Sequence, residues 1–242
     1  MATTASVTKT HVDPRNYRAD QGFFLGLSVI LTVLILTGFG QLAARGITDP
    51  IGAPLRLHTH ALLLVGWLGI FCMQNWLIYR GNLAWHRMLG WLAMALVAAI
   101  IVANYVVTIA VITEGRLGPQ FTPAGFTALG TADTLTFVGL IGWAVAMRRN
   151  TQWHRRLMFG ATLMVAAAGF NRLLGALPYS EVLSIASQLA FVAAIAWHDR
   201  RALGHIHKAT IVIAAMVLIQ RSLPTLLPKL DPWVDFTNRL TG

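Results

Sequence analysis

Three histidines each precede a basic residue at the start of a long apolar segment. They are His86 in Trp85-His86-Arg87, His154 in Trp153-His154-Arg155, and His207 in Ile206-His207-Lys208. Imidazoles on facing helices of a bundle can bind a metal ion or supply both axial ligands of a haem. Tryptophan, histidine and basic side chains also collect at membrane interfaces without binding a cofactor. The residue types leave both interpretations open for each histidine.

A second group of polar residues lies inside the apolar segments. Ionisable groups cost about 2.5–3.5 kcal/mol or more at the centre of a bilayer, so they usually face the interior of a helix bundle and serve a function. His60, Trp67 and Gln74 are seven residues apart and therefore share one helix face. The whole group is His60, Gln74, Asn104, Asp133, Arg172, Gln188 and Arg221.

The polar residues fall at two depths. Asn104 follows His86 by 18 residues, and Arg172 follows His154 by 18 residues. Five helical turns span about 27 Å, so the members of each pair belong to opposite leaflets. We expect an outer layer of His60, Asn104, Asp133, Arg172 and Arg221, and an inner layer of His86, His154, His198, His205 and His207.

The elements that must position these residues are transmembrane helices. The chain has 242 residues, of which 56% are hydrophobic and only 12% charged, about half the charge of an average soluble domain. Its apolar runs of about 20 residues are long enough to cross the hydrocarbon core. We expect seven spans, at 23–44, 57–79, 86–112, 124–147, 155–177, 180–197 and 207–227. The short connections predict an all-α polytopic membrane helix bundle, with one leading helix followed by three helical hairpins of related sequence.

Basic residues are distributed unequally between the two ends of these spans. With the N-terminus inside, 12 Lys and Arg residues lie in cytoplasmic segments and 7 on the other side. This bias predicts a cytoplasmic N-terminus and a periplasmic C-terminus. We divide the chain into a cytoplasmic polar segment (1–22), a membrane domain (23–228) and a periplasmic interfacial tail (229–242). Cytoplasmic loops and lipid headgroups account for the net charge of +10, so we expect no nucleic-acid partner.

An ordered set of residues in the first hairpin carries a family resemblance. It contains His58-Thr59-His60, Gly66-Trp67 and Gln74, followed by His86-Arg87-Met88-Leu89-Gly90-Trp91. The set resembles the DUF2306 family of predicted membrane proteins, in which a histidine opens one helix, a glutamine lies near its end and an H-R-x-L-G signature opens the next. The resemblance implies a multi-pass protein of the bacterial inner membrane, and it supports a role for His60, Gln74 and His86. The later hairpins have Asp133 and Gln188 in place of His60 and Gln74, so the resemblance covers the first hairpin alone.

The hypothesis that we favour is a redox protein. It would bind haem b, or a transition metal ion such as copper or iron, through intramembrane histidines. The candidate cofactor ligands are His60, His86, His154 and His207, of which His60, His86 and His154 are also candidate metal ligands.

Two other hypotheses use the polar residues differently. One is a binding, sensing or transport protein, whose periplasm-facing pocket takes an anionic or carbonyl-bearing small ligand. Its pocket would be lined by Gln74, Asn104, Asp133, Arg172, Gln188 and Arg221. The other is a structural accessory subunit of a membrane complex, or a homo-oligomer, in which these residues only fix helix packing. The sequence has no G-x-S-x-G, H-E-x-x-H, P-loop or dinucleotide-binding motif, and whether the protein is an enzyme stays open.

Overall fold

The computed structural model describes residues 14–46 and 51–241, and all regular elements within these ranges are helices. Seven of the helices are long and apolar enough to cross a membrane. The predicted all-α bundle with seven spans is therefore confirmed, and the chain is an integral multi-pass membrane protein in contact with lipid. The helices are α1 (Pro14–Ala44), α2 (Leu55–Tyr79), α3 (Leu83–Thr113), α4 (Pro123–Ala146), α5 (Thr151–Leu174), α6 (Ser180–Leu203), α7 (Lys208–Leu226), the 3-10 helix η1 (Leu227–Lys229) and α8 (Asp231–Thr241).

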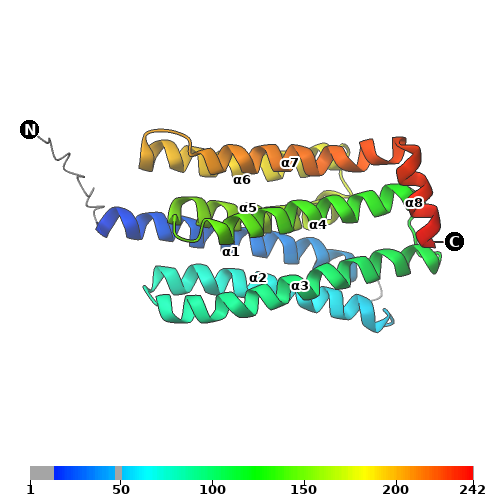
Figure 1. Ribbon diagram of the computed structural model, residues 1–242, viewed down its shortest axis with the longest axis horizontal. Coiled ribbons are helices and arrows are strands. Elements are labelled where there is room, and N and C mark those ends of the chain that lie inside the picture. Colours follow the sequence, from blue (N-terminus) through cyan, green and yellow to red (C-terminus); the bar gives the residue numbers. More distant parts are fainter. Residues whose placement is uncertain (1–13, 47–50, 242) are drawn as a thin grey trace, which may run out of the picture.

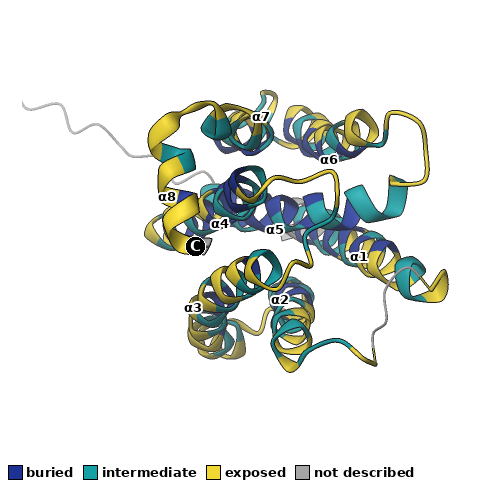
Figure 2. Cartoon of the chain, turned by 90° about the vertical axis from the view of Figure 1, so that its right-hand side faces the viewer, coloured by how far each residue is buried: buried dark blue, intermediate teal, exposed yellow. Residues whose placement is uncertain are grey.

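The helices form three layers (Figures 1 and 2). Helices α1, α5 and α4 make the central layer, with the α2–α3 hairpin on one side and the α6–α7 hairpin on the other. Helix α5 is the most deeply buried span and packs against α1, α4, α6 and α7. The α2–α3 hairpin joins the central layer mainly through α1 and α4.

Glycines bring the backbones of α1 and α5 into contact. A Cβ atom added to Gly38 would lie 2.2 Å from the carbonyl oxygen of Gly169, and one added to Gly169 would lie 2.9 Å from Cα of Ile35. Small residues at such crossings allow close van der Waals packing, which drives helix association in lipid. This contact fixes the leading helix against the centre of the bundle.

The first two hairpins share a local structure at the start of their returning helices. The side chain of Asn82 accepts a hydrogen bond of 3.3 Å from the Trp85 amide, and Asn150 accepts one of 3.3 Å from the Trp153 amide. Both asparagines are N-caps, which satisfy an amide that the helix itself leaves unpaired. The third hairpin differs, because His207 is itself the N-cap of α7 and its Nδ1 accepts from the Ala209 amide at 3.1 Å.

Helix ends depart from the predicted spans where buried charges are paired. Helix α5 begins at Thr151 rather than 155, and α6 continues to Leu203 rather than 197. Arg155 and Arg156, at the predicted start of the fifth span, and Asp199, beyond the predicted end of the sixth, are therefore buried residues within helices. Helix α1 begins at Pro14, inside the predicted polar segment, whose residues 1–13 lie outside the described part of the chain.

The C-terminal tail, predicted at 229–242, contains the helix α8. Helix α8 lies across the ends of α3 and α4, at the opposite end of the bundle from the start of α1 (Figure 1). The indole Nε1 of Trp233 donates to the carbonyl of Ala124 at 3.1 Å, which holds α8 on α4. We refer to the end of the bundle that carries the α2–α3, α4–α5 and α6–α7 turns as the N-terminal face, and to the end that carries α8 as the C-terminal face.

Candidate cofactor site

The first two hairpins place His86 and His154 next to each other at the N-terminal face. Each histidine is the fourth residue of its helix, in α3 and α5 respectively, and both follow an asparagine cap. Their ring centroids are 6.4 Å apart and their ring planes meet at 89°. The structure therefore brings two of the four predicted cofactor ligands together.

Hydrogen bonds fix the orientation of this pair. Nδ1 of His154 lies 2.8 Å from the carbonyl oxygen of Ala144 in α4. A carbonyl only accepts, so Nδ1 carries the hydrogen and leaves Nε2 with a lone pair, the arrangement usual for metal-binding histidines. The side chain of Gln74 donates to the backbone carbonyl of His86 at 3.2 Å. Nδ1 of His86 and Oε1 of Gln74 are buried and have no hydrogen-bond partner among the described residues.

The separation of the two rings matches that of two imidazoles on one metal. A metal–nitrogen bond of about 2.0–2.1 Å, plus roughly 1.1 Å from the nitrogen to the ring centre, puts opposite imidazoles about 6.3 Å apart. The observed 6.4 Å agrees with this value. The distance between the two rings is therefore compatible with a single metal atom bound by both histidines.

The glycine that follows His86 by one turn has no close neighbour. A Cβ atom on Gly90 would approach nothing nearer than the Gln74 amide nitrogen, at 3.9 Å, whereas one on Gly160 would lie 2.6 Å from Ile213. Helix packing thus explains Gly160 and not Gly90.

The remaining predicted cofactor ligands lie elsewhere. His60 is 14 residues before Gln74 on α2, about 21 Å along the helix axis, and is therefore remote from the pair. His207 caps α7, and its ring packs at 5.3 Å against the Trp153 ring. Burial, together with the positive charge of nearby Arg156, lowers the pKa of His207 below its ordinary value. His207 is therefore neutral near pH 7, as its hydrogen bond from Ala209 requires.

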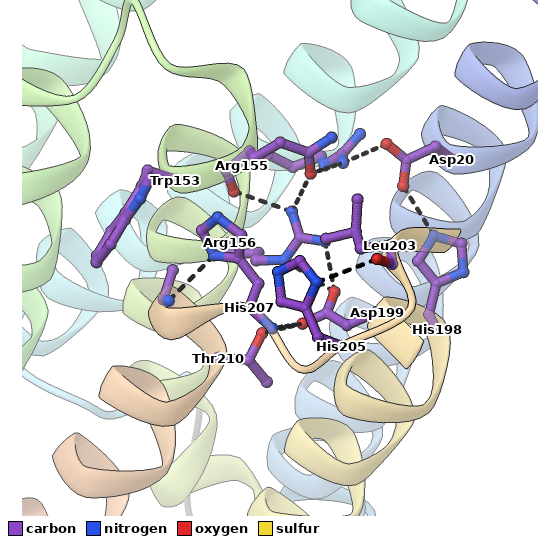
Figure 3. A network of polar contacts seen from close by, with 12 residues as sticks. Asp20, Trp153, Arg155, Arg156, His198, Asp199, Leu203, His205, His207 and Thr210 are labelled. Atoms are coloured by element: carbon purple, nitrogen blue, oxygen red, sulfur yellow. Dashed lines mark hydrogen bonds and ion pairs between the residues drawn. The ribbon is translucent and has the colours of Figure 1, made fainter. Parts of the chain in front are cut away.

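A buried ion pair occupies the N-terminal face beside this pair (Figure 3). Arg156 and Asp199 are both fully buried, and the guanidinium donates to the carboxylate through Nε and Nη2. The other carboxylate oxygen accepts from the hydroxyl of Thr210 and from the backbone amide of His207. The cluster joins α5, α6 and α7. Because each charge is paired within the protein, we interpret the cluster as structural, holding these three helices together.

A second cluster of polar side chains joins α1 to α5 and α6. The carboxylate of Asp20 bonds to the guanidinium of Arg155 and lies 2.8 Å from Nε2 of His198 (Figure 3). The His198 ring stacks on Phe23 at a centroid distance of 3.9 Å. We did not predict Asp20, Arg155, Arg156 or Asp199 as interior residues, because charges near the ends of spans resemble loop charges. One signal in the sequence could have identified them: two adjacent arginines lie at the same depth as an aspartate on an antiparallel helix.

Two residues of the predicted outer layer, Asp133 and Arg221, are the ends of a hydrogen-bonded chain of side chains. Asp133 accepts from the Gln220 amide at 2.7 Å, and Gln220 accepts from the Gln188 amide at 3.1 Å. Gln188 accepts in turn from Arg221, through Nε at 2.9 Å and Nη2 at 2.7 Å. Arg221 also donates to Ser184 at 2.8 Å. Asp133, Gln188 and Arg221 are therefore engaged with the protein itself, and Gln220 is a member that we did not predict.

Three predicted pocket residues lie outside this chain, namely Gln74 beside His86, Asn104 and Arg172. Asn104 donates to the hydroxyl of Thr134 at 2.8 Å and to the carbonyl of Gly130 at 3.2 Å, which ties α3 to α4. Arg172 donates to the carbonyl of Ala168, its own helix, at 3.0 Å. Of the predicted outer layer, His60 has a buried ring nitrogen, Nδ1, without a hydrogen-bond partner among the described residues.

Comparison with known proteins adds no assignment. No family model, curated protein or solved structure matches the chain. The resemblance of the first hairpin to the DUF2306 family stays a prediction, and the function must be argued from the geometry.

Proposed function

We propose that this membrane protein binds haem b between His86 and His154 and takes part in electron transfer. The observation that supports it most is the placement of the two rings, whose centroids are 6.4 Å apart, so that both histidines would be available to hold one haem. Bound haem would supply one-electron redox chemistry. The chain's own contribution is to hold the ligand nitrogens, since the Ala144 carbonyl orients the ring of His154 and Gln74 bonds the backbone of His86.

Haem fits this donor set better than an isolated metal ion does. No group of three or more His, Cys, Asp or Glu side chains is assembled within the described ranges. A structural transition-metal site takes about four protein ligands, whereas haem carries four nitrogens of its own and requires only two axial ligands. A pair of histidines therefore meets the ligand requirement of haem and falls short of that of a bare copper or iron ion.

We infer that this site faces the cytoplasm of a bacterial cell. When the buried Arg155 and Arg156 are left out of the basic-residue count, 12 falls to 10 on the N-terminal face. When the half-buried Arg172 and Arg221 are left out, 7 falls to 5 on the other face. The positive-inside bias therefore keeps its direction. Exposed arginines around the site supply positive charge that suits haem propionates, namely Arg80, Arg87, Arg148 and Arg149.

The absorbance spectrum of the detergent-purified protein tests this proposal. Cells supplied with a haem precursor should yield a coloured protein with about one haem per chain, and reduction should shift its Soret and α bands. His86→Ala and His154→Ala should each abolish the bound haem, because either change removes an axial ligand. His60→Ala and His58→Ala serve as matched controls and should retain haem, since neither residue belongs to the pair.

Thermal unfolding of the same variants separates loss of haem from loss of fold. If His86→Ala keeps a cooperative transition in detergent while its haem content falls, the ligand role stands. A wild-type preparation without haem and without iron after precursor feeding would refute the proposal.

A further inference from the structure

Helix α2 presents two buried polar atoms that have no partner in the protein. The side chain of Trp67 is 1% exposed, and neither its Nε1 nor Nδ1 of His60 has a hydrogen-bond partner among the described residues. The two residues are seven apart on one face of α2, about 10 Å along the axis. An unsatisfied buried polar group costs about 1–3 kcal/mol. Two such groups on one face therefore point to a ligand that bonds to them.

The surroundings of Trp67 are apolar and aromatic. Its ring meets the ring of Phe137 from α4 edge to face, with a centroid distance of 5.1 Å and an interplanar angle of 86°. Phe71 and Val97 belong to the same buried cluster. An indole N–H is a donor only. A ligand that bonds to the indole N–H must therefore carry a hydrogen-bond acceptor. The rest of the ligand must be flat and apolar, because its other neighbours are apolar and aromatic side chains.

The charges near His60 also favour an acceptor. Arg172 on α5 interacts electrostatically with His60 and with Asp133. Its guanidinium lies 4.4 Å over the Phe39 ring, and no carboxylate of the described residues is within ion-pair distance of it. Arg221, by contrast, already donates to Gln188 and Ser184. His60, Trp67 and Arg172 thus form a set rich in donors.

We propose that His60, Trp67 and Arg172 bind the head group of a lipophilic quinone. A quinone has two carbonyl oxygens that accept, a flat ring, and an apolar tail that dissolves in lipid, so it meets each requirement of these residues. The proposal goes beyond haem binding and does not depend on it, because the two sites share no residue. Trp67 and Gln74 are seven residues apart on α2, so the two sites are about 10 Å apart along the helix axis.

Quinone binding is tested with the protein in lipid nanodiscs and a benzoquinone carrying a decyl chain. Empty nanodiscs give the partition baseline. We expect saturable binding of about one quinone per chain above this baseline. Trp67→Phe keeps an aromatic ring against Phe137 but removes the N–H, and should weaken binding about 3- to 10-fold, the range of one hydrogen bond. Trp91→Phe is the matched control, since Trp91 is 80% exposed, and should leave the affinity unchanged.

Further variants separate the quinone site from its alternatives. His60→Leu and Arg172→Gln should also weaken binding, whereas the His86→Ala/His154→Ala double variant should bind quinone as the wild type does, so failure of either proposal leaves the other testable. Uptake no greater than in empty nanodiscs would overturn the quinone site. So would equal affinities of the wild type and Trp67→Phe, or full displacement of the quinone by laurate at the concentration at which it partitions.

Discussion

Arg156 is the residue on which the packing of the N-terminal face depends most. Its guanidinium and the carboxylate of Asp199 are both fully buried and bonded to each other. Removal of one partner of a buried pair leaves an uncompensated charge and costs about 3–5 kcal/mol. We therefore expect Arg156→Met to lower the thermal midpoint of the detergent-solubilised protein strongly. Arg200→Met is the control, because Arg200 is exposed one residue beyond Asp199, and equal effects of the two changes would contradict the assignment.

His207 makes the stability of the same face depend on pH. Burial lowers its pKa in the folded protein below the ordinary 6.5, and the charge of Arg156 acts in the same direction. The stabilisation is therefore complete above pH 6.5 and is lost as the pH falls through the lowered pKa, when Nδ1 gains a proton and stops accepting from the Ala209 amide. His207→Asn keeps an N-cap acceptor that does not titrate.

The measurement is the thermal midpoint of the wild type and His207→Asn between pH 7 and pH 5. The wild type should lose more stability over this range than the variant does. His58→Asn is the control, because His58 is exposed at the start of α2, on the C-terminal face, and it should retain the wild-type slope. A wild-type slope in His207→Asn as well would assign the acid sensitivity to another group.

At the scale of the element, the contact between α1 and α5 leaves no room for a side chain. A Cβ atom on Gly38 would lie 2.2 Å from the carbonyl oxygen of Gly169, whereas one on Gly40 would meet nothing within 4 Å. Overpacking of this kind typically costs about 1–3 kcal/mol. Gly38→Ala should therefore destabilise the protein and increase hydrogen exchange along α1, while Gly40→Ala should do neither. Unchanged exchange in Gly38→Ala would show that α1 is not held by this crossing.

The helices were predictable from the sequence, but most of the hydrogen-bond partners of their buried polar side chains were not. Hydropathy is a local property, so apolar runs located all seven spans. The pairing of His86 with His154 was also within reach, because the asparagine cap and the Trp-His-Arg triplet recur at the same place in two hairpins. The hydrogen-bonded chain from Asp133 through Gln220 to Arg221 could not be predicted from the sequence, because it depends on how α4 and α7 are rotated about their axes. The burial of Arg156 was not predicted, because the sequence alone does not distinguish an arginine in a buried ion pair from a solvated arginine at the end of a helix.

At the scale of the whole molecule, the orientation in the membrane decides which compartment each site faces. The excess of basic residues on the N-terminal face predicts that this face is cytoplasmic, so the haem pair would exchange electrons on the inside and the outer layer would face the periplasm. A single cysteine introduced at each face, in a Cys72→Ala background, reports the orientation. Arg149→Cys lies on the N-terminal face and Arg116→Cys on the C-terminal face, and both parent residues are exposed. In intact cells, a membrane-impermeant maleimide should label Arg116→Cys strongly and Arg149→Cys only after lysis. The reverse pattern would place the histidine pair on the outside and would refute the predicted cytoplasmic N-terminus.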